Sequence, residues 1–192
     1  MRQVIFLLFF LLNTDLIDLF MNDYLKSIRI IKDFPKKGIA FYDISTILSN
    51  PKEFNKIVNR MANEVKKLKV NTIVGIDSRG FIFASAVAYK LKMKLIMIRK
   101  KGKLPGKTHQ ISYNLEYGSN HLEIQKDMIN VNDKIAIIDD IFATSGTMKA
   151  SIKLVKKSKA VVKGVIVLLE LDFLKGRSKF KEKLISLENT NI

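Results

Sequence analysis

The chain has 192 residues, 47% of them hydrophobic, and its length suits one hydrophobic core with a small appendage better than two independent domains. It contains no cysteine, which excludes disulfide bonds and thiolate zinc sites. Its 34 lysine and arginine residues against 18 acidic residues give a net charge of +16. This charge predicts an anionic partner without choosing among nucleic acid, a membrane surface and phosphorylated metabolites. Because no RNP-like aromatic motif or zinc finger is present, we expect no nucleic-acid partner and interpret most lysines as a solvated surface.

The N-terminal residues differ from the rest of the chain. Arg2 and the apolar run at residues 4–12 resemble the hydrophobic region of a signal peptide, and the run is too short to span a membrane. No clear small-residue cleavage site follows. A targeting segment, a membrane-surface anchor and a gene start placed upstream of Met21 are three interpretations that the sequence leaves open. We therefore treat residues 1–26 as an extension and residues 27–192 as the domain, and we expect a cytoplasmic protein.

Residues 49–68 carry the signals of an amphipathic helix. Asn50 suits the N-cap, Pro51 suits the first turn, and Glu53 lies three residues after the cap. Apolar residues then recur with helical spacing, which predicts that one face packs on a core. These residues are Phe54, Ile57, Val58, Met61, Val65 and Leu68.

Strand and helix patterns alternate through the remainder of the chain. The predicted strands are residues 71–77, 94–98, 134–140 and 161–170, and the predicted helices between them include residues 80–91 and 145–157. This alternation predicts an α/β fold, a parallel sheet with helices on both faces. Ligands of such sheets bind beyond the carboxyl ends of the strands. The loops that follow the first three strands are therefore the candidate binding loops.

The loop after the third of these strands is the most informative. Asp139 and Asp140 end an apolar strand, and the hydroxylated residues Thr144, Ser145 and Thr147 lead into a helix. Free N–H groups at a helix N-terminus suit a phosphate, although the glycine and lysine spacing of a P-loop is absent. Because adjacent strand residues point to opposite sides, the aspartates suit ribose hydroxyls better than a shared proton. An acidic pair alone would favour a turn, but the hydroxyl-rich loop favours a ribose phosphate.

This strand, aspartate pair and loop resemble the phosphoribosyl pyrophosphate (PRPP) signature of the type I phosphoribosyltransferases. Four further segments, in the same order along the chain, resemble the adenine phosphoribosyltransferase family: DFPKKGIAFYDIS, GIDSRGFIF, IRKKGKLPG and SYNLEYGSNHLEIQKD. The match runs from about Ile28 to the end of the third loop, with weaker similarity at LLELDFLKGR. The resemblance implies the parallel-sheet fold of type I phosphoribosyltransferases, with a small hood.

The resemblance also implies the reaction. Such an enzyme acts in purine salvage, transferring ribose 5-phosphate from PRPP to N9 of adenine and giving AMP and pyrophosphate. Mg²⁺ would be carried by PRPP with no direct protein ligand, and the enzyme would be a homodimer. Two alternatives are a phosphoribosyltransferase for another purine base and a non-catalytic PRPP-sensing protein. The second usually adds a DNA-binding module, for which the residues before Ile28 are too few.

Each candidate residue receives a role from the resemblance. The expected contacts of the 5′-phosphate are Ala143, Thr144, Ser145, Gly146 and Thr147. The expected contacts of the ribose are Asp139 and Asp140. The expected contacts of the pyrophosphate are Arg79, Arg99, Lys100 and Lys103. The expected contacts of adenine are Ala40, Phe41 and Ile141.

The hood is expected in the polar, glycine-containing segment at residues 102–118, because long polar excursions in compact domains are usually functional. By resemblance, Glu116 exchanges a proton with the purine and Tyr117 helps to cover the sugar. Two residues depart from the family pattern. Tyr42 replaces a basic residue, and Ser145 replaces a glycine at a loop position where glycine tolerates more backbone conformations.

Overall fold

The computed structural model of the chain describes residues 24–114 and 119–190, which fall into two units divided after Glu53. The first unit begins with a 3₁₀ helix, η1 (Tyr24–Ser27), followed by an antiparallel hairpin of β1 (Arg29–Lys32) and β2 (Ala40–Asp43). Arg29 donates hydrogen bonds to the Asp43 carboxylate at 2.5 and 3.1 Å. The short helix α2 (Ser45–Leu48) follows, and the Ser45 N–H donates to Asp43 at 2.9 Å. The predicted extension lies outside the described residues up to position 23.

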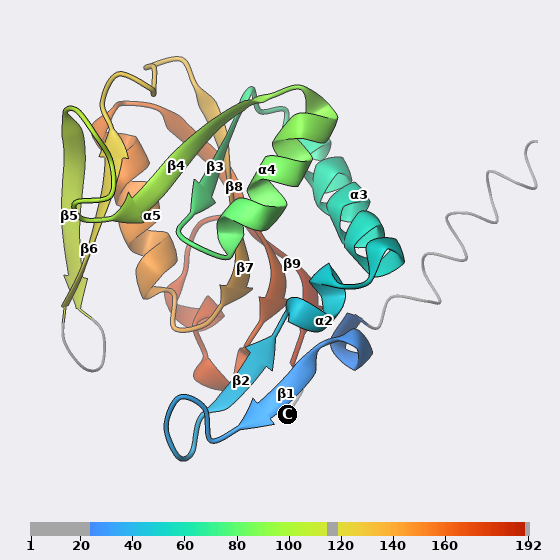
Figure 1. Cartoon of the computed structure of the whole chain (residues 1–192). Helices are drawn as coiled ribbons and strands as arrows, with labels where there is room; N and C mark the ends of the chain where they lie inside the picture. The colour runs from blue at the N-terminus through green and yellow to red at the C-terminus, as the bar shows by residue number, and fades with distance from the viewer. Residues whose placement is uncertain (1–23, 115–118, 191–192) are drawn as a thin grey trace, which may run out of the picture. The chain divides into compact units, whose positions relative to one another are not determined.

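The second unit is built on a seven-stranded sheet with the order β5-β6-β4-β3-β7-β8-β9 (Figure 1). The strands are β3 (Thr72–Ile76), β4 (Lys94–Lys100), β5 (Thr108–Asn114), β6 (Ser119–Gln125), β7 (Lys134–Phe142), β8 (Val161–Glu170) and β9 (Leu184–Asn189). Five strands, β3, β4, β7, β8 and β9, pair in parallel. The β5–β6 hairpin joins the end of β4 in antiparallel register.

Three longer helices accompany this sheet: α3 (Pro51–Lys67), α4 (Gly80–Leu91) and α5 (Gly146–Lys157). Two short 3₁₀ helices, η2 (Asp172–Leu174) and η3 (Arg177–Lys179), follow β8. The predicted cap of α3 is confirmed, since the Asn50 side-chain oxygen accepts hydrogen bonds from the N–H groups of Lys52 and Glu53 at 3.1 and 3.3 Å. Helix α4 packs on β3, β4 and β7, and α5 packs on β8 and the β5–β6 hairpin, on the opposite face of the sheet (Figure 1).

The centre of the sheet is buried on both of its faces. Four consecutive residues of β7, Ile135 to Ile138, have no exposed surface, and β8 continues the apolar layer with Val165 to Leu169. Consecutive burial of this kind requires cover on both faces, which is the condition of a parallel sheet. Each such aliphatic side chain contributes roughly 1.5–3 kcal/mol to folding. The sheet is therefore a rigid base for the loops at its carboxyl edge.

The structure differs from the sequence expectation mainly at the edges of the sheet. The four predicted strands and the helices 80–91 and 145–157 are confirmed, each with bounds within two residues. Within the expected hood, however, residues 108–114 form β5 rather than an irregular excursion. Strand β9 and the β1–β2 hairpin were not predicted. In the part of the chain that the structure describes, no helix is long and apolar enough to cross a membrane.

Candidate active site

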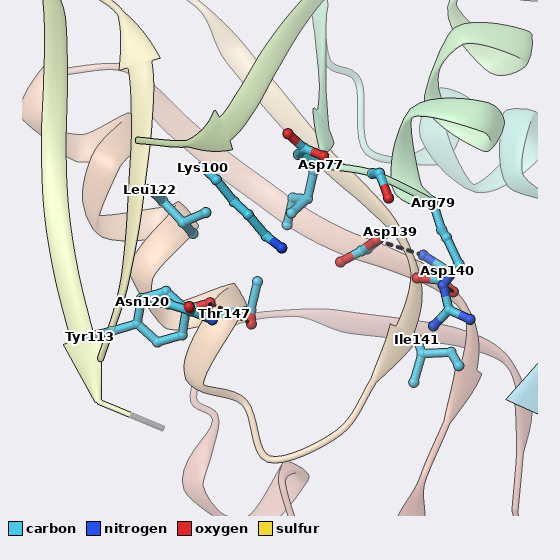
Figure 2. Close-up of a pocket in the computed structure, with 12 residues that line it drawn as sticks. Asp77, Arg79, Lys100, Tyr113, Asn120, Leu122, Asp139, Asp140, Ile141 and Thr147 are labelled. Atoms are coloured by element: carbon cyan, nitrogen blue, oxygen red, sulfur yellow. Dashed lines mark hydrogen bonds and ion pairs between the residues drawn. The ribbon is translucent and has the colours of Figure 1, made fainter. Parts of the chain in front are cut away.

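A cavity of about 370 Å³ opens at the carboxyl edge of the sheet in the second unit (Figure 2). Its lining comes from the β3–α4 loop, the ends of β4 and β7, the β5–β6 hairpin and the start of α5. The volume lies in the range typical of small-molecule sites. The position confirms the expectation that the loops following the strands converge on one place.

Asp139 is held at this edge by the close approach of α4. The helix begins at Gly80, and a Cβ atom there would lie 2.6 Å from Asp139 Oδ1 and 3.0 Å from the carbonyl oxygen of Ile138. Only a residue without a side chain therefore allows this contact between α4 and β7. Asp139 Oδ1 also accepts a hydrogen bond from the Asp140 N–H at 2.9 Å. Burial, together with the neighbouring negative charge of Asp140, raises the pKa of Asp139 well above its ordinary value.

Asp140 is buried and forms an ion pair with Arg79, whose Nε lies 2.7 Å from Asp140 Oδ2. Burial raises the pKa of Asp140, and the positive charge of Arg79 opposes this rise. Figure 2 shows both side chains beside Ile141. Strand β7 continues for two residues beyond the aspartate pair, where Ile141 and Phe142 pair with β8. The aspartates are thus anchored within a strand and do not belong to its loop.

The predicted pyrophosphate contacts divide into two groups. Arg79 and Lys100 line the cavity, whereas Arg99 and Lys103 are not among its lining residues. Arg99 donates hydrogen bonds to the Asp77 carboxylate at 3.1 Å and to the Lys103 carbonyl at 3.2 Å. It therefore joins the β3–α4 loop to the β4–β5 loop. Neighbouring strand residues point to opposite sides, so Arg99 and Lys100 at the end of β4 face different surroundings.

The loop from Ala143 to Thr147 connects β7 to α5 and surrounds a smaller cavity of about 80 Å³. Ser145 is buried and has φ 74° and ψ −9°, the conformation of the third residue of a type II turn, which usually requires glycine. Its side chain makes no capping hydrogen bond to α5. The departure from the family pattern therefore falls on the residue whose backbone most favours glycine. Free N–H groups at the start of α5 make this loop suitable for an anion.

A segment after β8 supports the same loop, a role that the sequence pattern did not predict. A Cβ atom on Gly176 would lie 1.8 Å from the carbonyl oxygen of Ala143. The Leu171 N–H donates to the Phe142 carbonyl at 2.9 Å, and the rings of Phe142 and Phe180 lie 5.2 Å apart. The weak resemblance at LLELDFLKGR was the available signal for this support.

Three lining residues come from the hairpin and were not predicted: Tyr113, Asn120 and Leu122. Tyr113 lies in the segment predicted as the hood, and Asn120 and Leu122 follow that segment. No local pattern indicates which of these side chains face the cavity. Of the remaining predicted residues, Glu116 and Tyr117 lie outside the described residues.

The predicted adenine contacts come from different units. Ala40 and Phe41 belong to β2 of the first unit, where the Phe41 ring meets Phe34 edge-on at 5.1 Å. Ile141 belongs to β7 of the second unit and lines the cavity. A shared adenine slot therefore stays a prediction.

Comparison with known proteins agrees with this geometry. The phosphoribosyl transferase domain family matches residues 43–187. An adenine phosphoribosyltransferase of Mycoplasma mobile is 50% identical over 167 residues, covering 87% of this chain and 96% of that protein. The crystal structure of the Thermoanaerobacter pseudethanolicus adenine phosphoribosyltransferase matches with a TM-score of 0.84 and 41% identity, covering 88% and 98% of the two chains. The Saccharomyces cerevisiae enzyme, complexed with an imino-altritol bisphosphate and adenine, matches with a TM-score of 0.82 and 36% identity, covering 86% and 96%.

The fold, the matched domain and the cavity at the carboxyl edge together define a phosphoribosyltransferase. Half of the aligned residues are identical to those of the Mycoplasma mobile enzyme, across nearly its whole length. The chain belongs to the adenine phosphoribosyltransferase family, and the predicted family and fold class are confirmed.

Proposed function

We propose that the chain transfers ribose 5-phosphate from PRPP to N9 of adenine, releasing pyrophosphate and giving AMP for purine salvage. The observation that carries this proposal is the order of groups around the carboxyl edge of the sheet. A phosphate-binding loop, an aspartate pair and two cationic side chains follow one another there. Phosphate, sugar and pyrophosphate follow one another in the same order in PRPP.

The 5′-phosphate would bind the loop from Ala143 to Thr147, where backbone N–H groups and the dipole of α5 favour an anion. Asp139 and Asp140 would accept hydrogen bonds from the ribose hydroxyls. As the bond between C1′ and pyrophosphate breaks, positive charge develops on the sugar, and a nearby carboxylate stabilises it. Asp140 is the better candidate for this charge, because Arg79 favours its ionised form.

Arg79 and Lys100, which line the cavity, would bind the leaving pyrophosphate. Arg99 and Lys103 would support this site from the adjoining loops. The donor groups of the cavity fit a Mg²⁺ ion that arrives on PRPP, because magnesium commonly keeps water and phosphate oxygens and takes only one or two carboxylates. In the described ranges, no group of three or more histidine, aspartate or glutamate side chains could hold the ion by itself. When bound, Mg²⁺ would neutralise part of the pyrophosphate charge.

The roles of the base and of its acid–base partner rest on the resemblance. Glu116 would exchange a proton with the purine ring, and Tyr117 would help to cover the sugar. Adenine would contact Ala40, Phe41 and Ile141.

We also propose a cytoplasmic homodimer. Support for a second copy comes from four apolar side chains exposed on α4 and β4: Ile82, Tyr89, Leu95 and Met97. Tyr89 is 90% exposed and lines a shallow, largely apolar groove. Tyr89 and Leu95 both line this groove, and exposed apolar surface rimmed by polar residues marks interaction sites on proteins. Sedimentation of the purified chain as a monomer at micromolar concentration would contradict the homodimer.

The reaction is tested by incubating the purified chain with PRPP, Mg²⁺ and each purine base, and by following pyrophosphate release. Turnover with adenine is expected, and a reaction without Mg²⁺ is the control. Turnover only with hypoxanthine or guanine would support phosphoribosyl transfer but would replace adenine as the proposed substrate. Binding of PRPP without turnover of any base would favour the non-catalytic alternative.

A further inference from the structure

Tyr113 reaches from the end of β5 to the phosphate-binding loop. Its hydroxyl lies 3.1 Å from Thr147 Oγ1 on the first turn of α5. Two carbons of its ring lie 3.6 and 3.7 Å from the position that a Cβ atom on Gly146 would take. Figure 2 shows Tyr113, Asn120 and Thr147 together on one side of the cavity. The half-buried tyrosine thus contacts two successive residues of the loop through different parts of its side chain.

One arrangement of hydrogen bonds satisfies Asn120, Tyr113 and Thr147 together. Asn120 Nδ2 can only donate, and it lies 3.5 Å from the Tyr113 oxygen. In this arrangement the phenol accepts from Asn120 and donates its own proton to Thr147 Oγ1, although the geometry of the 3.1 Å contact allows either hydroxyl to donate. A threonine hydroxyl has a single proton, so accepting from Tyr113 leaves that proton free to point elsewhere. So arranged, Asn120, Tyr113 and Thr147 form a chain of donors in one direction, in which each bond strengthens the next.

The ring of Tyr113 covers the loop at its least bulky residue. Gly146 has no side chain, and the ring occupies the space in van der Waals range above it. A ring in this place keeps water from one side of the backbone N–H groups that begin α5. Exclusion of water strengthens the electrostatic contacts between such groups and an anion.

We propose that Tyr113 is a positioning residue for the 5′-phosphate of PRPP. It orients the Thr147 hydroxyl so that this group donates its proton to the phosphate, and its ring covers the loop at Gly146. The inference rests on the proposed function, because it takes the loop from Ala143 to Thr147 as the phosphate site. It assigns no role to Tyr113 in the proton exchange with the base.

The test is Tyr113→Phe, which keeps the ring and removes the donor. We expect the KM for PRPP to rise about fivefold, the loss typical of one neutral hydrogen bond. The KM for adenine, and kcat at saturating PRPP, should change less than twofold. The matched control is Ser112→Ala, which removes an exposed contact between Ser112 Oγ and His121 Nδ1 at 2.8 Å on the same hairpin. This control should leave all three constants unchanged.

A double-mutant cycle separates orientation of Thr147 from a general effect on the hairpin. In a Thr147→Val background, Tyr113→Phe should add less than a twofold further rise in the KM for PRPP. Additive effects, an unchanged KM for PRPP, or equal rises in the KM for both substrates would overturn the proposal. If the wild-type chain binds PRPP but turns over no adenine, the PRPP affinities of the same variants, measured by calorimetry, test the role of Tyr113 in place of the KM values. Failure of the wild-type chain to bind PRPP would overturn it together with the proposed function.

Discussion

Replacement of Ser145 by glycine should stabilise the protein, because this serine has a backbone conformation that L-residues seldom adopt. Its φ of 74° and ψ of −9° lie where a Cβ atom costs roughly 1–2 kcal/mol. Glycine removes this cost but loses roughly 0.5–1 kcal/mol more conformational entropy on folding. Because the Ser145 side chain makes no capping hydrogen bond, its removal forfeits none. The net gain should be about 0.5–1 kcal/mol, a rise in Tm of about 2 °C for a chain of this size.

Thermal and urea denaturation of the Ser145→Gly variant beside the wild type measure this gain. Lys92→Gly is the matched comparison, since Lys92 at the end of α4 also has positive φ, at 53°, and does not line the cavity. Both variants should be stabilised by similar amounts. A lower Tm for Ser145→Gly, with Lys92→Gly stabilised, would refute the reasoning that backbone strain dominates at Ser145. A rise of more than about tenfold in the KM for PRPP would show that the Ser145 hydroxyl binds the phosphate.

Three further substitutions test the rest of the site. Burial raises the pKa of Asp139, so its carboxyl keeps a proton in the folded chain at pH values where the unfolded chain has released it. Stability should therefore fall as pH rises from the ordinary carboxyl pKa to the raised pKa of Asp139. In the Asp139→Asn variant, Tm should depend less on pH over this range, and turnover should be lower than in the wild type. The same dependence of Tm on pH in both proteins would contradict this expectation. Gly176→Ala would place a Cβ atom 1.8 Å from the Ala143 carbonyl oxygen. We therefore expect the free energy of unfolding in urea to fall by about 1–3 kcal/mol and the KM for PRPP to rise. An unchanged KM would show that the contact with Gly176 does not affect PRPP binding. Glu116→Ala should lower the single-turnover rate strongly and leave PRPP affinity nearly intact, and a normal rate would remove Glu116 from the mechanism.

The predictions that succeeded came from patterns local in the chain. Residues 135–138 are uniformly apolar up to the aspartates, and a short apolar run in a chain of alternating strands and helices favours a strand buried on both faces. The cap at Asn50 and the close of the helix at Leu91 depend on neighbours within a few residues.

The placement of side chains around the cavity depended on contacts between distant segments. Arg99 and Lys100 are adjacent cations in the sequence, yet strand alternation and pairing of β4 with β6 bring only Lys100 to the cavity. Asp77 and the Lys103 carbonyl satisfy Arg99 instead. No composition or periodicity of residues 94–100 distinguishes these outcomes, because they are set by the register of neighbouring strands.

By itself, the sequence determined the α/β class, the edge of the sheet where the cavity opens, and the succession of aspartate pair, hydroxylated loop and helix. These follow from periodicity and short motifs, which act over a few residues. Only the tertiary structure decided that Tyr113 meets Thr147, that Gly80 makes room for Asp139, and that Gly176 lies under Ala143. Such contacts join residues tens of positions apart, and they form only after the hairpin has paired in one register and the helices have packed on the sheet.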